Sequence, residues 1–403
     1  MHDNDMDDQG WLEGVKLWYN DQDYLGAIEI WQEILDALNW SDGKLLHESE
    51  FPSTLLEEPA PFGTNVARRL LFLAGCQLDA QNVRLARTSL IRCLRCSDDW
   101  DTTTARLALQ EWLCSYEEEA HENNDGEAAL NMSRQIVEFA VRKGCRYWRD
   151  PYQRPGFLYA SLQDCKPHYE GDDRPAWCSV LEQNWERIRD EFLRLTRGGS
   201  TTQHWPAVGT SDHRGGAGQH DHKVVDGDWR EVVLFGSGAR PDLAPYTSSL
   251  IRKYIPEATS LAEQGGGEVI FSVLSSKTRI RAHCGSTNLR LTAHLGLSIP
   301  STSSEDCGIR VADEWHTWEK GKVLVFDDSY EHEVKNLTSE YRAVLLLRFW
   351  HSNLDPEKRA KALTEAVEAK ELDSLRRYNP PMTAEQTREL ERQAGLPRQP
   401  YHV

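Results

Sequence analysis

The feature that most constrains the fold is a series of short strand-type runs in the second half of the chain. The runs are rich in Val, Ile, Leu and Phe and are separated by turn residues; they are 232–235, 268–274, 278–283, 287–299, 309–312, 322–326 and 342–350. Short strands that follow one another at close spacing predict an antiparallel sandwich or jelly roll. A short helix at about 248–254 and a glycine-rich turn at 265–267 are expected between the first two runs.

The first part of the chain follows the helical period instead. Apolar residues recur three or four positions apart in amphipathic stretches over 11–38, 66–96 and 104–143, and this spacing predicts helices. Small residues at close-contact positions resemble those of tetratricopeptide hairpins; they are Gly75, Ala86, Ala128 and Ala129. True repeats would present a concave peptide-binding surface, whereas a plain helical bundle fits the irregular spacing equally well.

The regions on either side of the strands are expected to be helical or irregular. An amphipathic helix is predicted at 177–195 and another at about 356–377. The stretch 198–228 is rich in Gly, Ser, His and Asp, which predicts an exposed, mobile loop. His220 and His222 in this loop could bind a metal, but ordering a flexible segment costs conformational entropy.

Composition and charge exclude several classes of function. The net charge of −18 argues against a general nucleic-acid or anionic-membrane surface, since both need clustered positive charge. The mean hydropathy is −0.62, and no apolar run approaches the roughly 20 residues that span a bilayer. The acidic N-terminus carries no apolar signal, so we expect a cytoplasmic protein. Its nine cysteines are expected to be reduced, and the CxxC at Cys93 and Cys96 to be buried and structural.

Three polar residues lie where a jelly roll could bring them together. His283 ends one strand, His332 follows the turn at 327–330, and Arg342 begins a strand that is otherwise apolar. A buried arginine needs an anion, and its planar guanidinium suits a carboxylate. Two imidazoles suit Fe(II), but iron oxygenases usually add a carboxylate two residues after the first histidine. Here that residue is Gly285, so either the iron has two protein ligands or there is no metal.

Five sequence strings in this order resemble the aspartyl/asparaginyl β-hydroxylase family. They are Tyr152–Gly156, Arg281–Asn288, Arg290–Leu297, Trp318–Lys322 and Phe326–Val334. The family lacks the third carboxylate, so Gly285 supports the resemblance. The resemblance extends over roughly 148–355, with a helical region in front as in the family.

The residue patterns and the resemblance together predict an α+β fold in three parts. An N-terminal all-α, tetratricopeptide-like domain would occupy 1–145, and a double-stranded β-helix (jelly-roll) oxygenase domain with flanking helices 146–355. A C-terminal helical extension would occupy 356–403. A chain of 403 residues is long enough for more than one core.

The resemblance also implies the cofactors and their ligands. His283 and His332 would bind Fe(II), and Arg342 and Ser272 would hold the distal carboxylate of 2-oxoglutarate. His294 would hold the carboxylate nearer the metal. The family carries an arginine where this chain has Thr292. Residues 290, 292 and 294 share one face of a strand, so we hypothesise that Arg290 supplies the missing charge.

The implied reaction hydroxylates a C–H bond of a peptide or protein, the β-carbon of Asp or Asn, with release of succinate and CO2. The substrate could dock on the helical domain. The disulfide of the secretory-pathway enzymes is ruled out, because no cysteine lies between Cys178 and Cys284. A substrate other than their EGF-like modules is therefore expected.

Two alternatives remain open. A related oxygenase could act on a lipid acyl chain or a small molecule, although no membrane element is expected. The other alternative is an inactive helical-repeat adaptor. It stays open because Thr292 stands where the family has an arginine. Four residues near the site are interpreted as surface or turn residues: His316, His351, Asp327 and Asp328.

Overall fold

The computed structural model describes residues 10, 13–14, 16–21, 23–36, 64–80, 82–96, 103–122, 127–145, 148–196 and 224–376. Their contacts divide the chain into two compact units. One unit comprises 1–151 with 370–403, and the other comprises 152–369. Among the described helices, none is long and apolar enough to cross a membrane.

The first unit is helical, as the sequence predicts. Its elements are η1 (Leu17–Asp21), α2 (Tyr24–Asp36), α4 (Thr64–Asp79), α5 (Val83–Arg95), α6 (Thr103–Glu122) and α7 (Glu127–Arg142). Trp18, Trp31 and Phe72 pack edge to face at 4.8–5.8 Å between ring centroids, and Gly75 admits Trp18 closely. Cys93 and Cys96 are buried in the same core, which confirms the structural prediction. The tetratricopeptide-like arrangement stays a prediction.

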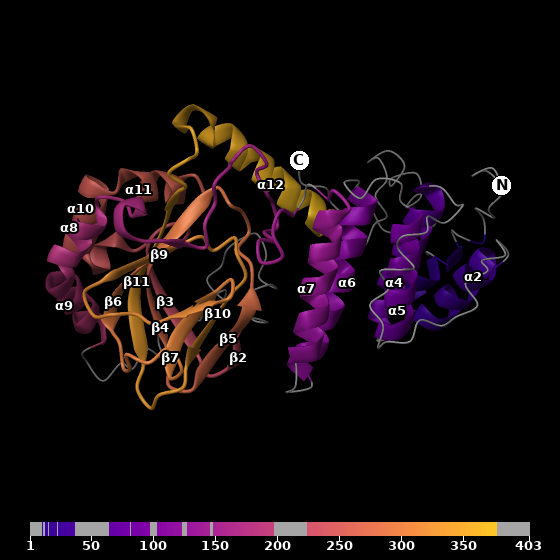
Figure 1. The fold of residues 1–403 in the computed structure, drawn as a ribbon, viewed down its shortest axis with the longest axis horizontal. Coiled ribbons are helices and arrows are strands. Elements are labelled where there is room, and N and C mark those ends of the chain that lie inside the picture. Colours follow the sequence, from indigo (N-terminus) through magenta and orange to yellow (C-terminus); the bar gives the residue numbers. More distant parts are fainter. Residues whose placement is uncertain are drawn as a thin grey trace. The chain divides into compact units, whose positions relative to one another are not determined.

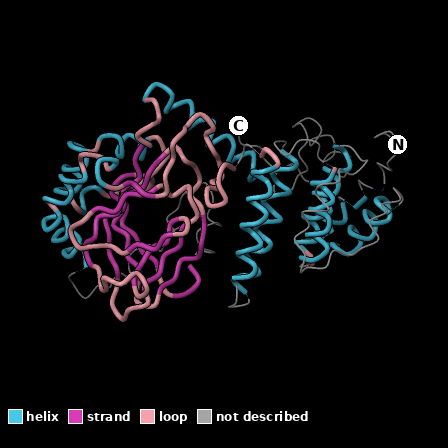
Figure 2. Tube along the Cα trace, in the orientation of Figure 1, coloured by secondary structure: helices cyan, strands magenta, loops and turns pink. Residues whose placement is uncertain are grey.

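The second unit contains two antiparallel sheets. The larger has the order β1-β9-β6-β11-β4-β3 and the smaller β2-β5-β10-β7-β8. The larger sheet comprises β1 (His168–Tyr169), β3 (Trp229–Phe235), β4 (Val269–Leu274), β6 (Arg290–Ser298), β9 (Val323–Phe326) and β11 (Arg342–Trp350). The smaller comprises β2 (Val224–Asp226), β5 (Thr278–His283), β7 (Cys307–Val311), β8 (Glu314–His316) and β10 (His332–Asn336). Figure 2 shows the strands of this unit in magenta.

Side-chain alternation along β11 gives the larger sheet an inner and an outer face. Val344 and Leu346 point to a core shared with β5, β7 and β10 of the smaller sheet. Leu345 and Leu347 point the other way, to a core shared with the helices. Those helices are α8 (Cys178–Gln183), α9 (Trp185–Thr196), α10 (Pro245–Tyr254) and α11 (Pro256–Glu263). They cover the outer face (Figure 1), so the space between the sheets is left for the site.

Several elements differ from the prediction. The loop predicted for 198–228 is wrong at its end, because Val224–Asp226 form β2 and pair with β5; residues 197–223 lie outside the described part. The single helix predicted at 177–195 is two, α8 and α9, separated at Asn184, whose side chain bonds the Val180 carbonyl. The predicted C-terminal helix is present as η5 (Pro356–Lys358) and α12 (Arg359–Arg376).

Candidate active site

The two predicted metal ligands face each other across neighbouring strands. His283 at the end of β5 pairs directly with His332 at the start of β10, and their ring centroids are 4.2 Å apart. Metal–imidazole bonds are about 2 Å long, so both rings can reach one ion. Nδ1 of His332 lies 2.9 Å from the Tyr330 carbonyl oxygen. That carbonyl can only accept, so Nδ1 carries the proton and Nε2 is the ligand atom.

The position of the absent carboxylate is already filled by Asp328. A Cβ atom placed on Gly285 would lie 2.7 Å from the backbone oxygen of Asp328 and 2.9 Å from its Cγ. The Gly285 amide donates to that same backbone oxygen at 2.6 Å. No third His, Cys, Asp or Glu of the described residues joins the histidine pair with ligand atoms within 4.8 Å of one another. The fold therefore has room for a glycine at 285 and for no side chain.

Asp328 lies in the turn that the sequence suggests, and its carboxylate pairs with two cations. The carboxyl is buried, and its Oδ2 lies 3.1 Å from Nε of Arg348 and 3.5 Å from Nη2 of Arg290. Its Oδ1 is buried without a hydrogen-bond partner. Asp328 thus fixes the backbone beside Gly285 through two ion pairs.

Arg342 is a buried cation with unfilled hydrogen-bonding capacity. It starts β11, is 2% exposed, and its Nε and Nη1 have no hydrogen-bond partner. The Trp318 ring lies against the guanidinium, 4.5 Å from Cζ to the ring centroid. Burial lowers the pKa of Arg342 to about 10, which leaves the group charged at neutral pH. A buried charge of this kind needs an anion.

His294 is held in one tautomer and keeps one nitrogen unused. Trp318 donates from Nε1 to Nδ1 of His294 at 3.1 Å, so the ring proton is on Nε2. Nε2 is buried and has no partner. Burial, and then the charges of Arg342 and His332, lower the pKa of His294 well below its ordinary value. The ring is therefore a neutral donor directed into the space between the sheets.

The remaining predicted contacts lie on the same inner face. Ser272 on β4 accepts a hydrogen bond from Nε1 of Trp229 at 3.0 Å. Thr292 is buried with its Oγ1 unpartnered. Arg290 donates to the Gly266 carbonyl at 2.7 Å and pairs with Asp328. These contacts already use part of its guanidinium, so its role toward a cosubstrate stays a prediction.

Sequence reasoning missed the two tryptophans that organise these groups. Trp318 contacts both His294 and Arg342, and Trp229 bonds Ser272. Trp318 stands in one of the family-like strings, which was a usable signal. No sequence pattern marked Trp229, because its contact with Ser272 depends on the pairing of β3 with β4.

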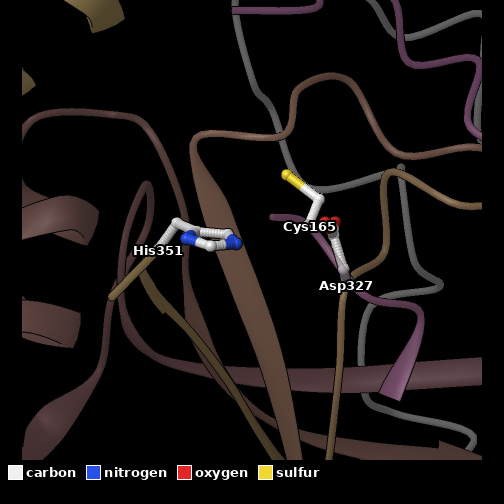
Figure 3. A group of neighbouring side chains, drawn as sticks. All are labelled: Cys165, Asp327 and His351. Carbon is white, nitrogen blue, oxygen red and sulfur yellow. The ribbon is translucent and has the colours of Figure 1, made fainter. Parts of the chain in front are cut away.

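A second group of polar residues lies at the end of β9, which Asp327 follows directly. Figure 3 shows Cys165, Asp327 and His351, whose ligand atoms lie within 4.8 Å of one another. His351 is completely buried, so its prediction as a surface residue is wrong. Asn353 N–H donates to its Nδ1 at 3.1 Å, and its Nε2 lies 2.8 Å from the Tyr169 hydroxyl. Both ring nitrogens are satisfied, and a hydrogen-bond network explains this group.

The inner face thus presents two kinds of binding capacity. The histidine pair can hold a metal ion, and the unpartnered donors of Arg342 and His294 can hold the oxygens of an acid beside it. Phe326 lies between them, with ring centroids 6.0 Å from His332 and 5.0 Å from His294. The donor set fits a metal ion together with a dicarboxylate.

Comparisons with known proteins agree with this arrangement. The family model "Aspartyl/Asparaginyl beta-hydroxylase" matches residues 182–352. The human protein named aspartyl/asparaginyl beta-hydroxylase is 37% identical over 184 residues, 44% of this chain and 22% of that protein. Human aspartate beta-hydroxylase domain-containing protein 1 is 36% identical over 205 residues, 50% of this chain and 49% of that protein.

A lipid-modifying enzyme is also among the relatives. The ornithine lipid ester-linked acyl 2-hydroxylase of Rhizobium tropici is 29% identical over 197 residues, 47% of this chain and 62% of that protein. The chain spans about a fifth of the length of the first of these relatives.

Proposed function

We propose that this chain, whose residues 182–352 match the aspartyl/asparaginyl β-hydroxylase family model, is a 2-oxoglutarate- and Fe(II)-dependent dioxygenase. It would hydroxylate the β-carbon of an Asp or Asn side chain in a peptide or protein. The two facing sheets of the second unit would then be a double-stranded β-helix, and the helical unit a tetratricopeptide-like domain.

The observation that carries the proposal is the unsatisfied charge of Arg342. Its Nε and Nη1 are buried between the sheets with no acceptor, in a strand whose other residues are nearly all apolar. Leaving a buried donor unpaired costs about 1–3 kcal/mol, and more for a charged group. The distal carboxylate of 2-oxoglutarate would remove that cost, and Ser272 on the adjacent strand would add a hydroxyl contact.

The other residues would orient the cosubstrate and the metal. His283 and His332 would hold Fe(II), with His332 fixed in its tautomer by the Tyr330 carbonyl. His294 would donate from Nε2 to the carboxylate nearer the metal, and Trp318 would keep that proton in place. When bound, Fe(II) and 2-oxoglutarate supply the O2-dependent oxidation of a C–H bond, with release of succinate and CO2.

The relatives and the helical unit both favour a peptide or protein substrate. The names of the human relatives refer to aspartate and asparagine, and a helical repeat would offer a peptide-binding surface. A second candidate, an acyl chain, is favoured by the match to the ornithine lipid hydroxylase. Cys178 and Cys307 are free thiols, and no cysteine lies between Cys178 and Cys284, so we expect a substrate other than that of the disulfide-linked secretory enzymes.

The experiment offers both substrates to the purified protein with Fe(II), 2-oxoglutarate and O2. We expect succinate release and the addition of one oxygen atom to Asp- or Asn-containing peptides, detected by mass spectrometry, and neither change with His332→Ala. Oxygen added to an ornithine lipid and to no peptide would favour the second candidate. No turnover of either, with intact metal binding, would favour the inactive adaptor.

A further inference from the structure

A further group of metal-type side chains lies at the open edge between the two sheets. His168 stands on β1, the last strand of the larger sheet, and Glu314 and His316 stand on β8, the last strand of the smaller. The rings of His168 and His316 are 3.9 Å apart between centroids. Nε2 of His316 lies 3.5 Å from a Glu314 oxygen. One ligand atom from each of the three residues lies within 4.8 Å of the other two.

The strand pairing places all three residues on the inner faces of their sheets, at the edge, where the Glu314 side chain still reaches solvent. Glu314 pairs with Val311 and His316 with Ile309, and both partners point to the inner core. His168 pairs with Phe326, which also faces that core. Directly paired residues share one face of a sheet, so the two edges present their side chains to each other.

The imidazole nitrogens of this group are unsatisfied. Both ring nitrogens of His168 and Nε2 of His316 are buried from solvent and make no regular hydrogen bond. Burial, and then His316, lower the pKa of His168, and Glu314 and the Val311 carbonyl oppose this only in part. Buried polar atoms without regular hydrogen bonds are rare and costly. A cation bound between the two rings would give these nitrogens a partner.

This group differs from the one formed by Cys165, Asp327 and His351. There, both nitrogens of the imidazole already have hydrogen-bond partners. Here, three of the four ring nitrogens are buried without a regular hydrogen bond, and Nε2 of His316 has only its 3.5 Å contact with Glu314. The group also differs from His283 and His332, because Val311 pairs with His332 on one side and with Glu314 on the other. Glu314 on β8 is therefore two strands away from His332 on β10. At about 4.8 Å per strand, this is about 10 Å across the sheet.

We propose that His168, Glu314 and His316 form a second metal site, which binds a divalent transition ion of the zinc class and ties the edge strands of the two sheets together. Two imidazoles and one carboxylate are ordinary ligands for Zn²⁺. The Glu314 side chain is 67% exposed, so water can fill the remaining coordination positions. Because the ligands come from β1 and β8, binding would hold the two sheet edges together.

The test measures Zn²⁺ bound per full-length chain by equilibrium dialysis after removal of metal with a chelator. The starting protein carries His283→Ala and His332→Ala, so that zinc cannot bind at the iron ligands. We expect one equivalent of bound zinc, and its loss when His316→Gln is added. Glu314→Gln should also weaken binding, and because this side chain is exposed, the change should leave folding intact.

Two control variants separate other sources of binding. Adding Cys165→Ala tests the buried hydrogen-bonded group, and adding His220→Ala with His222→Ala tests the histidine-rich segment. Both should retain the equivalent of zinc. In the His283→Ala, His332→Ala protein, zinc should raise the midpoint of thermal unfolding, and adding His316→Gln should abolish that increase.

The proposal is overturned if the His283→Ala, His332→Ala protein binds no zinc. It is also overturned if the bound ion survives His316→Gln, or is lost with Cys165→Ala or with the His220 and His222 changes. None of these outcomes depends on the hydroxylase activity, so the metal site and the proposed function stand or fall separately.

Discussion

At the scale of single residues, the site is defined by buried polar atoms that have no hydrogen-bond partner, above all those of Arg342 and His294. The sequence predicted that Arg342 would need an anion, because it opens an apolar strand, and the structure places its guanidinium in the core with Nε and Nη1 unpaired. A charge kept in that state weakens the folded protein unless a ligand occupies the site.

Replacing Arg342 with Met should separate stability from cosubstrate binding. Removing a buried, unpaired charge should leave the free energy of unfolding of the ligand-free protein unchanged or higher. The same change should weaken 2-oxoglutarate binding by about 3 kcal/mol, roughly a hundredfold. Denaturant unfolding and calorimetric titration measure the two effects. Arg240→Met is the control, because Arg240 is an exposed partner of Asp242. Strong destabilisation with unchanged 2-oxoglutarate affinity would show that Arg342 is structural.

Gly285 provides a second prediction at this scale. Gly285→Asp restores the usual third ligand in sequence, but its Cβ would lie 2.7 Å from the Asp328 backbone oxygen. We expect a loss of stability of about 1–3 kcal/mol and no gain in iron affinity. Thermal unfolding and iron titration measure both effects. Ser286→Asp, at the exposed next residue, should have little effect on stability. A Gly285→Asp protein that is fully stable and binds iron more tightly would contradict this account.

The buried acid Asp327 predicts a pH dependence. Burial raises the pKa of Asp327 to about 8, the charge of Asp328 adds to the increase, and the Ser329 contacts oppose it. The folded state then keeps a proton that the unfolded state loses above about pH 4. Stability should fall by about 1.4 kcal/mol per pH unit as the pH rises from about 4 to about 8.

Asp327→Asn should remove this dependence, because an amide cannot ionise. The free energy of unfolding should be measured at about pH 5 and about pH 8. Relative to the wild type, the variant should become more stable as the pH rises. Asp242→Asn, at an exposed carboxylate, should show no such gain. A difference between Asp327→Asn and wild type that is constant over this range would refute a protonated Asp327.

At the scale of elements, β10 is held in register by a buried ion network. Glu331, which precedes the strand, lies 2.7 Å from Nη2 of Arg154 and 2.8 Å from Nη2 of Arg310. Burial acts to raise the pKa of Glu331, but the two arginines outweigh it and lower the pKa to about 2. The network joins the segment before β1 to β7 and β10, and so positions His332.

Glu331→Gln should destabilise the protein by about 3–5 kcal/mol, because it leaves two buried guanidinium groups short of an anion. Urea unfolding measures the loss. The matched control is Asp173→Asn, which breaks the exposed Lys166–Asp173 pair of the same 2.7 Å length and should cost about 0–1 kcal/mol. Equal effects of the two substitutions would show that the network does not stabilise β10.

The strands show which elements could be predicted from sequence. Long apolar runs such as β4 and β11 were found with their boundaries nearly correct, because their burial on both faces is visible in the residue types. The strands β1, β2, β8 and β10 were missed. They are two to five residues long, and all but β2 are rich in polar residues. They form strands because of the partners with which they pair. His332 was accordingly predicted to lie beyond a turn, although it begins β10.

At the scale of the whole molecule, the change from helical to strand periodicity correctly separated a helical part from a part built of antiparallel sheets. The metal and cosubstrate candidates could be named because family-like strings carry them. The residues that support them could not be predicted. Trp229 acquires its role only when β3 pairs with β4, and Asp328 only when it packs against Gly285. The burial of His351 was missed for the same reason, since its partners Tyr169 and Asn353 are brought to it by the fold.

The most direct test of an iron site that holds 2-oxoglutarate is an anaerobic titration of the purified chain with Fe(II) and 2-oxoglutarate, followed by visible absorption. We expect the charge-transfer band of a cosubstrate bound to iron in the wild type, and its loss in His332→Ala. Arg342→Met should need a far higher concentration of 2-oxoglutarate to reach the same band. A wild-type chain that gives no band, or a band that persists in His332→Ala, would contradict the account.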